Sequence, residues 1–115
     1  MKGQVLDDGA LVMSDIDTVA TAIDDLEAGR TFDLTELALD PGNGAAVPET
    51  VELVEDVPFG HKVALVAHED GDDVYKYGEV IGAAAGAVAV GEWVHTHNCE
   101  SKRGRGDLAA TEGSA

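Results

Sequence analysis

The fold class is decided by the stretch from Gly60 to Gly82, which reads GHKVALVAHEDGDDVYKYGEVIG. Residues 62–67 and 79–81 are short runs rich in Val, Ala, Leu and Ile, and glycines separate them. Short apolar runs between turn residues predict β-strands. The same pattern continues outward and predicts further strands at residues 31–37, 50–54 and 93–97. Short strands between frequent turns indicate a compact, mainly β domain.

Helix is a minor feature of this prediction. Residues 18–26 fit two helical turns, but Val19, Thr21 and Ile23 also alternate as a strand would. We therefore expect at most one or two short helices. Residues 39–48 contain Pro41, Gly42, Gly44 and Pro48 and are predicted to form an exposed loop.

One turn layout recurs along the chain. The stretches LEAG (residues 26–29), HEDG (68–71) and VAVG (88–91) each end in a glycine, and an apolar residue follows three positions later. Glycine takes positive φ angles at turns without steric cost. Repeated use of one turn type and true internal duplication both explain the pattern.

The length of 115 residues is that of one domain, and aromatic residues make up only 4%. The core must therefore consist mostly of Val, Leu, Ile and Ala, and so small a domain is expected to rely on a partner. We place the domain at residues 1–107 and a flexible tail at residues 108–115, which have little to bury.

The formal net charge is −16, from 7 Lys and Arg against 23 Asp and Glu. Binding to nucleic acid or to an anionic membrane needs a basic surface, so neither is expected. Residues 1–60 carry 2 − 14 = −12 and residues 61–115 carry 5 − 9 = −4, which places any anion site in the second half. Scattered acids favour adaptation to high salt, as in a halophilic protein, over the alternative of an acidic binding face.

The expected compartment is the cytoplasm. The chain has one cysteine, Cys99, so it can form no intrachain disulfide, which is consistent with a reducing environment. No charged-then-apolar leader opens it, and the apolar run at residues 80–90 has 11 residues against the roughly 20 that a bilayer requires.

The segment WVHTHNC (residues 93–99) carries the most informative chemistry. On a strand, His95 and His97 would share one face and could converge on a divalent metal or an anionic substrate. Asn98 follows with an amide donor and a carbonyl acceptor. The alternative is a pair of surface histidines.

Basic residues beside glycines form the second group of candidates. Arg103 and Arg105 lie with Lys102 in the run KRGR, where arginine forks could bind a carboxylate or phosphate. A solvated linker is the alternative. His61 and Lys62 follow Gly60, and Lys76 and Tyr77 precede Gly78, at what we predict to be the starts of two strands.

Four blocks in order resemble the SAF domain of the altronate/galactarate dehydratase family. They are DTVATAI…LEAG (residues 17–29), GHKVAL (60–65), YKYGEVIG (75–82) and VGEWVHTHN (90–98), and the resemblance runs from about Val5 to Asp107. It implies a β-clip fold and dehydration of sugar acids to 2-keto-3-deoxy acids, usually with iron or manganese. It also implies a large catalytic domain, which here would be a separate subunit that shares the metal.

Carried over by position, the resemblance implies that a set of polar residues faces the shared site. His95 and His97 are the first candidates for metal or substrate ligands or for acid–base catalysis, and His61 is the next. Lys62, Lys76, Tyr77 and Asn98 would bind substrate, and Arg103 and Arg105 would bind the substrate carboxylate or the large subunit.

Two alternatives remain open. The small subunit of sulfolactate sulfo-lyase has the same GHK, KYGE and HTHN blocks and eliminates bisulfite, whereas the CESKRGRGD run at residues 99–107 favours the dehydratases. A stand-alone SAF module that binds a sugar acid without a partner, as a monomer or a homo-oligomer, is the other.

Overall fold

The computed structural model describes residues 3–101, and every regular element in that range is a β-strand. This confirms the predicted mainly β class. The short helices that the prediction allowed do not occur between residues 3 and 101, and residues 18–26 contribute a strand. The strands are β1 (Gln4–Leu6), β2 (Ala10–Val12), β3 (Val19–Ala22), β4 (Thr31–Asp33), β5 (Thr50–Glu52), β6 (Lys62–Ala64), β7 (Asp73–Lys76), β8 (Glu79–Ala84), β9 (Trp93–Val94) and β10 (Cys99–Ser101).

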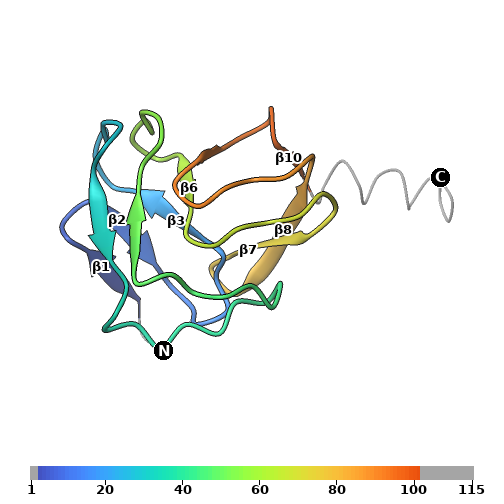
Figure 1. Cartoon of the computed structure of the whole chain (residues 1–115), viewed down its shortest axis with the longest axis horizontal. Helices are drawn as coiled ribbons and strands as arrows, with labels where there is room; N and C mark the ends of the chain where they lie inside the picture. Colours follow the sequence, from blue (N-terminus) through green and yellow to red (C-terminus); the bar gives the residue numbers. More distant parts are fainter. Residues whose placement is uncertain (1–2, 102–115) are drawn as a thin grey trace, which may run out of the picture.

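The strands form three antiparallel sheets (Figure 1). The largest has the order β1-β2-β3-β6-β9, the second β10-β8-β7, and β4 pairs with β5. Strands far apart in sequence meet in the largest sheet, since β3 pairs with β6 and β6 pairs with β9. The ends of β6 and β9 therefore lie side by side, and this position matters for the site described below.

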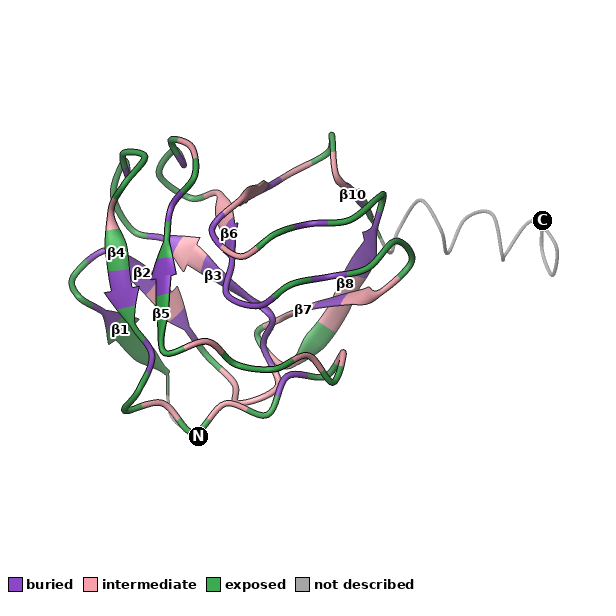
Figure 2. Cartoon of the chain, viewed as in Figure 1, coloured by how far each residue is buried: buried purple, intermediate pink, exposed green. Residues whose placement is uncertain are grey.

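Two apolar cores pack against opposite faces of the five-stranded sheet. Ala20 and Val63 belong to the larger core, which also takes side chains from β4 and β5, including the fully buried Phe32. Val19 and Ala64, their neighbours in sequence, belong to the second core, formed with the sheet β10-β8-β7. Alternate residues of a strand point to opposite faces, so the same short strands serve both cores. Figure 2 shows buried residues in purple on strands of both regions, for example on β5 and β8.

Several strands differ in length from the prediction, and β8 (Glu79–Ala84) extends three residues beyond the predicted 79–81. The predicted strands 31–37, 50–54 and 62–67 each shrink to three residues, because a turn begins sooner in each case. The loop predicted at residues 39–48 is confirmed as lacking strand, but only half of its residues are exposed and Pro41 is buried. Tyr77 and Gly78 do not begin a strand: they form the two-residue turn between β7 and β8, with φ angles of 55° and 78°. Such positive angles match the tight turns that join twisted antiparallel strands.

The recurrent turn occurs four times, not three. In each copy a bridging residue is followed three positions later by a glycine with φ between 83° and 92°. The fourth copy, VPFG (residues 57–60), has the same spacing but was not recognised in the sequence pattern. The four turns form two pairs, because Leu26 forms an antiparallel β-bridge with Val57 and His68 forms one with Val88.

Within each pair the hydrogen bonds are reciprocal. Gly29 N–H donates to the Leu53 carbonyl at 2.7 Å and Gly60 N–H donates to the Ala22 carbonyl at 2.8 Å. The second pair repeats this pattern, from Gly71 to the Ala84 carbonyl at 2.8 Å and from Gly91 to the Ala64 carbonyl at 2.9 Å. The structure thus contains two copies of one cross-braced turn unit, and His68 occupies a bridging position that is aliphatic in the other three turns.

Candidate functional site

Three histidines gather around one tryptophan where β6 begins and β9 ends. We call His61, Trp93, His95 and His97 the imidazole–tryptophan cluster. The β6–β9 register pairs Val63 with Trp93, and its continuation places His61 opposite His95. The two imidazole rings lie 4.6 Å apart between centroids.

Trp93 is the centre of this cluster. Its Nε1–H donates a hydrogen bond to His61 Nδ1 at 3.1 Å. Its ring stacks on His95 with a centroid separation of 5.5 Å and an interplanar angle of 8°. His97 lies against Trp93 at 5.2 Å in a tilted arrangement. The indole therefore contacts all three imidazoles.

A turn, not a continuous strand, brings His95 and His97 together. The predicted strand 93–97 is wrong beyond Val94, because the side-chain amide of Asn98 hydrogen-bonds to the backbone there and forms a turn. Asn98 Oδ1 accepts the His95 N–H at 2.9 Å, and Asn98 Nδ2 donates to the Trp93 carbonyl at 2.8 Å. Both polar groups of this amide thus have backbone partners, and Asn98 shapes the turn that presents the two imidazoles.

The electrostatic environment keeps the imidazole of His95 neutral. Burial lowers its pKa, and His61, Lys62 and His97 lower it further by charge repulsion. A histidine with a pKa below its ordinary value of 6.5 is unprotonated near pH 7 and can accept a proton.

Lys62 and Lys76 form a second polar group beside the cluster. The register places Lys62 between Thr21 of β3 and Val94 of β9. Burial lowers the pKa of Lys62, the charge of Lys76 acts in the same direction, and Cys99 opposes them. The influence of Lys62 on His95 indicates that the two groups of residues are close in space.

Lys76 and Tyr77 complete this second group. The Lys76 Nζ lies over the Tyr77 ring, 4.8 Å from its centroid, and Tyr77 Oη hydrogen-bonds Thr21 Oγ1 at 3.2 Å. Tyr77 has positive φ and lies in the turn after β7, so it does not share a strand face with Tyr75. An exposed tyrosine and two lysines can bind the carboxylate and hydroxyl groups of a small anion.

Asp17 positions this turn and was given no role in the sequence analysis. Its side chain is only 1% exposed, and it accepts three backbone hydrogen bonds. Oδ2 accepts the N–H groups of Met13 and Ser14, each at 3.1 Å, and Oδ1 accepts the N–H of Gly78 at 2.8 Å. The carboxylate thereby ties the Tyr77–Gly78 turn to the loop before β3. Its position in the DTVATAI block was the only available sequence signal.

Comparison with known proteins identifies the family. The family profile described as "Altronate/galactarate dehydratase SAF domain" matches residues 8–102. This chain belongs to that family. The SAF domain is 37% identical over 82 residues to galactarate dehydratase (L-threo-forming) of Escherichia coli and 41% identical over 83 residues to altronate dehydratase of the same organism. These matches cover 70% and 72% of this chain but only 13% and 14% of the dehydratases.

A third relative of the SAF domain is a small protein. The (2R)-sulfolactate sulfo-lyase subunit alpha of Paracoccus pantotrophus is 58% identical over 48 residues, which are 42% of this chain and 72% of that subunit. The relatives are thus lyases that eliminate either water or sulfite, in agreement with the resemblance in the four sequence blocks.

The SAF domain does not hold a complete metal site in its described part. Among residues 3–101, no group of three or more His, Cys, Asp or Glu side chains is arranged to hold a metal ion. His61 Nδ1 is already the acceptor for Trp93, which removes one potential donor atom. An ion at His95 and His97 would therefore need ligands from outside this range.

The remaining candidate residues differ in status. Arg103 and Arg105 lie outside the described residues, as do Lys102 and the tail predicted at residues 108–115. Cys99 is buried, and burial raises the pKa of its thiol, so the arrangement does not favour a nucleophile. Residues 3–101 contain no helix with the length and apolarity needed to cross a membrane.

Proposed function

We propose that this SAF domain is the small subunit of a lyase that dehydrates a sugar acid to a 2-keto-3-deoxy acid, together with a separate large catalytic subunit. The observation that carries the proposal is the packing of His95 against Trp93 and His61, in a position where burial and the charges of His61, Lys62 and His97 lower the pKa of His95. A proton acceptor beside cations is the combination that elimination from a carboxylic acid requires.

The proposed reaction is a β-elimination. His95 accepts the proton on the carbon next to the carboxylate, the electron pair of that C–H bond forms a C=C bond, and the β-hydroxyl leaves as water after it receives a proton. The resulting enol tautomerises to the 2-keto acid. Lys62 and Lys76 bind the substrate carboxylate and stabilise the charge that develops on it as the proton is lost.

The other residues have supporting roles in this proposal. His61 and His97 protonate the leaving hydroxyl or orient the substrate, and Tyr77 and Asn98 contribute to substrate binding. Arg103 and Arg105 bind the substrate carboxylate or the large subunit. An iron or manganese ion, when bound, would stabilise the enediolate. As an alternative to acid–base catalysis, His95 and His97 would contribute to its coordination, with the remaining ligands from the large subunit. The assembled enzyme would work in the cytoplasm.

Reconstitution tests the proposal. The large subunit, encoded in a neighbouring reading frame or recovered by pull-down with this chain, is mixed with wild-type chain and with variants, and the release of 2-keto acid from altronate and galactarate is measured. We expect activity only in the mixture, and a loss of roughly 10²–10⁴-fold for His95→Ala, the usual contribution of a general base.

The matched control is His68→Leu, which removes an imidazole outside the cluster and is expected to leave turnover unchanged. Wild-type activity in His95→Ala would contradict the site assignment. A chain that remains without a partner and binds a sugar acid on its own would instead support a stand-alone SAF module.

A second candidate, elimination of bisulfite from sulfolactate, is favoured by the 58% identity to a sulfo-lyase subunit alpha. Both candidates use the same proton abstraction and differ in the leaving group. The same reconstituted pair should therefore be assayed for bisulfite release from (2R)-sulfolactate. Turnover of sulfolactate without turnover of sugar acids would assign the second function.

A further inference from the structure

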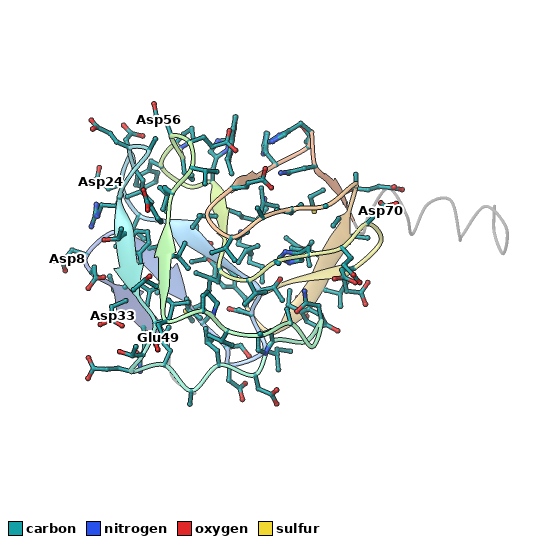
Figure 3. All side chains as sticks on the ribbon, in the orientation of Figure 1. Asp8, Asp24, Asp33, Glu49, Asp56 and Asp70 are labelled. Atoms are coloured by element: carbon teal, nitrogen blue, oxygen red, sulfur yellow. The ribbon has the colours of Figure 1, made fainter. Side chains whose placement is uncertain are left out.

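One end of the molecule exposes apolar side chains among carboxylates. We call residues 23–29 and 54–60, the first pair of recurrent turns, the acidic tip. Three large apolar residues are exposed there: Phe59 at 66%, Val54 at 58% and Ile23 at 38%. The same segments contain five acidic residues and no Lys or Arg. Figure 3 labels Asp24 and Asp56 on the neighbouring loops of this end.

The second pair of turns shows that the fold does not require this surface. Residues 65–71 and 85–91 have the same bridges and the same glycine hydrogen bonds, yet they expose no large apolar side chain. The positions equivalent to Phe59 in the other three turns are Ala28, Asp70 and Val90. Because the turn accepts such different residues, the exposed phenyl ring is not explained by the geometry of the backbone.

The acidic tip also contains a pocket of about 310 Å³ between its two turns. The exposed Pro58 supplies apolar surface, Leu26 and Val57 are buried lining residues, and the other lining residues are Asp25, Glu27 and Asp56. Asp25 Oδ1 accepts the Phe59 N–H at 2.9 Å and Asp56 Oδ1 accepts the Ala28 N–H at 2.8 Å, which holds both carboxylates at the pocket. An apolar floor with carboxylate walls matches the long stem and charged head of an arginine or lysine.

The acidic tip adjoins the imidazole–tryptophan cluster. Gly60 ends the second turn and His61 follows it directly. Glu55 Oε2, from the same loop, accepts the Trp93 N–H at 3.2 Å. A protein seated on the tip would therefore border the cluster.

We propose that the acidic tip is the surface on which the large subunit docks, with Phe59 in an apolar recess of that subunit and one of its basic side chains in the pocket. This inference rests on the proposed function. A second copy of this chain fits poorly, because it would bring five carboxylates against five. A basic surface is the complementary partner, and a single exposed aromatic ring surrounded by charge is a common anchor in protein interfaces.

The test measures the affinity of the purified large subunit for the full-length chain by calorimetry at low and high salt. We expect Phe59→Ala to weaken binding at least tenfold. The Glu27 side chain makes no hydrogen bond that supports the turn within residues 3–101, and Glu27→Lys should weaken binding by a similar factor and reduce its dependence on salt. Because Phe59 lies outside the catalytic cluster, kcat at saturating large subunit should be unchanged in Phe59→Ala.

Matched controls are Val5→Ala and Glu36→Lys, which alter an exposed apolar residue and an exposed charge away from the tip and should bind as wild type does. Wild-type affinity in both tip variants would overturn the docking surface and leave the proposed function standing. Failure of the wild-type chain to bind any large dehydratase or sulfo-lyase subunit would overturn both.

Discussion

Trp93 Nε1 and His61 Nδ1 are joined by a hydrogen bond of 3.1 Å across the β6–β9 pair. Because the indole nitrogen can only donate, His61 Nδ1 must be the acceptor, and the neutral ring carries its proton on Nε2. The bond therefore selects the tautomer of His61 and fixes the edge of the ring that faces away from Trp93.

Replacing Trp93 with Phe should remove the hydrogen bond that selects the Nε2–H tautomer of His61. The variant keeps an aromatic ring against His95 and His97 but has no donor for His61. We expect kcat/KM of the reconstituted enzyme to fall about tenfold, the range seen when an orienting partner of a histidine is lost. Nitrogen NMR of His61 should show a mixture of tautomers. A single Nε2–H tautomer in the variant would contradict this role.

The activity should depend on pH through His95. Only the neutral imidazole accepts a proton, so kcat/KM should rise with pH through the lowered pKa of His95, which places the midpoint below 6.5. Lys62→Met removes a neighbouring positive charge, so the pKa of His95 and the midpoint should move to higher pH. A midpoint that stays in place in this variant would show that Lys62 does not act on the base.

Acid should destabilise the fold through His68. This side chain is 3% exposed and neither ring nitrogen has a hydrogen-bond partner among residues 3–101. Burial lowers the pKa of His68, although Asp72 and the Val66 backbone act in the opposite direction. As the pH falls, His68 therefore binds a proton in the unfolded chain before it does so in the folded chain. The stability is fully present above pH 6.5 and is lost as the pH falls through the lowered folded-state pKa.

His68→Leu tests this prediction, since leucine is the bridging residue of the equivalent turn at Leu26. Urea unfolding at pH 7.5 should show a gain of about 1–3 kcal/mol from removal of an unsatisfied polar group. The loss of stability between pH 7.5 and 5.5 should become smaller than in wild type. His97→Gln, which removes an exposed imidazole, is the control and should retain the wild-type pH dependence.

Loss of the Asp17 carboxylate should be costly. Asp17→Ala leaves three backbone N–H groups without an acceptor, and each unsatisfied buried group costs about 1–3 kcal/mol. We expect urea unfolding to show a loss of about 3 kcal/mol or more. Asp17→Asn keeps one acceptor oxygen and should lose less. A loss of stability below about 1 kcal/mol in Asp17→Ala would contradict the role of the Asp17 carboxylate in holding the Tyr77–Gly78 turn.

Salt should stabilise the fold. The net charge of −16 repels itself in dilute buffer, and salt at 1 M shortens the Debye length to about 3 Å. The labelled acidic side chains in Figure 3 lie on several separate loops and, for Asp33, at the end of β4, which agrees with the scatter seen in the sequence. Adaptation to high salt stays a prediction. An identical circular-dichroism spectrum at 50 mM and 2 M KCl would count against it.

The sequence by itself determined the class of fold and the position of three of the four recurrent turns. Glycines at regular intervals require turns because positive φ is favourable for them, and at Gly29, Gly60 and Gly71 a Cβ would meet nothing within 4 Å. The conformation alone therefore calls for glycine at these three positions. The short apolar runs between the turns predicted β-strands, and the four sequence blocks indicated the family.

Only the tertiary structure decided how the candidate residues are arranged. Alternation along a strand predicted a shared face for His95 and His97, but Asn98 ends the strand, and a turn around Trp93 brings them together instead. His61 joins them through a pairing of strands that lie about 30 residues apart, which local pattern cannot specify. The partnership of the recurrent turns is likewise a long-range contact, so periodicity detected three of the turns but not which turn braces which.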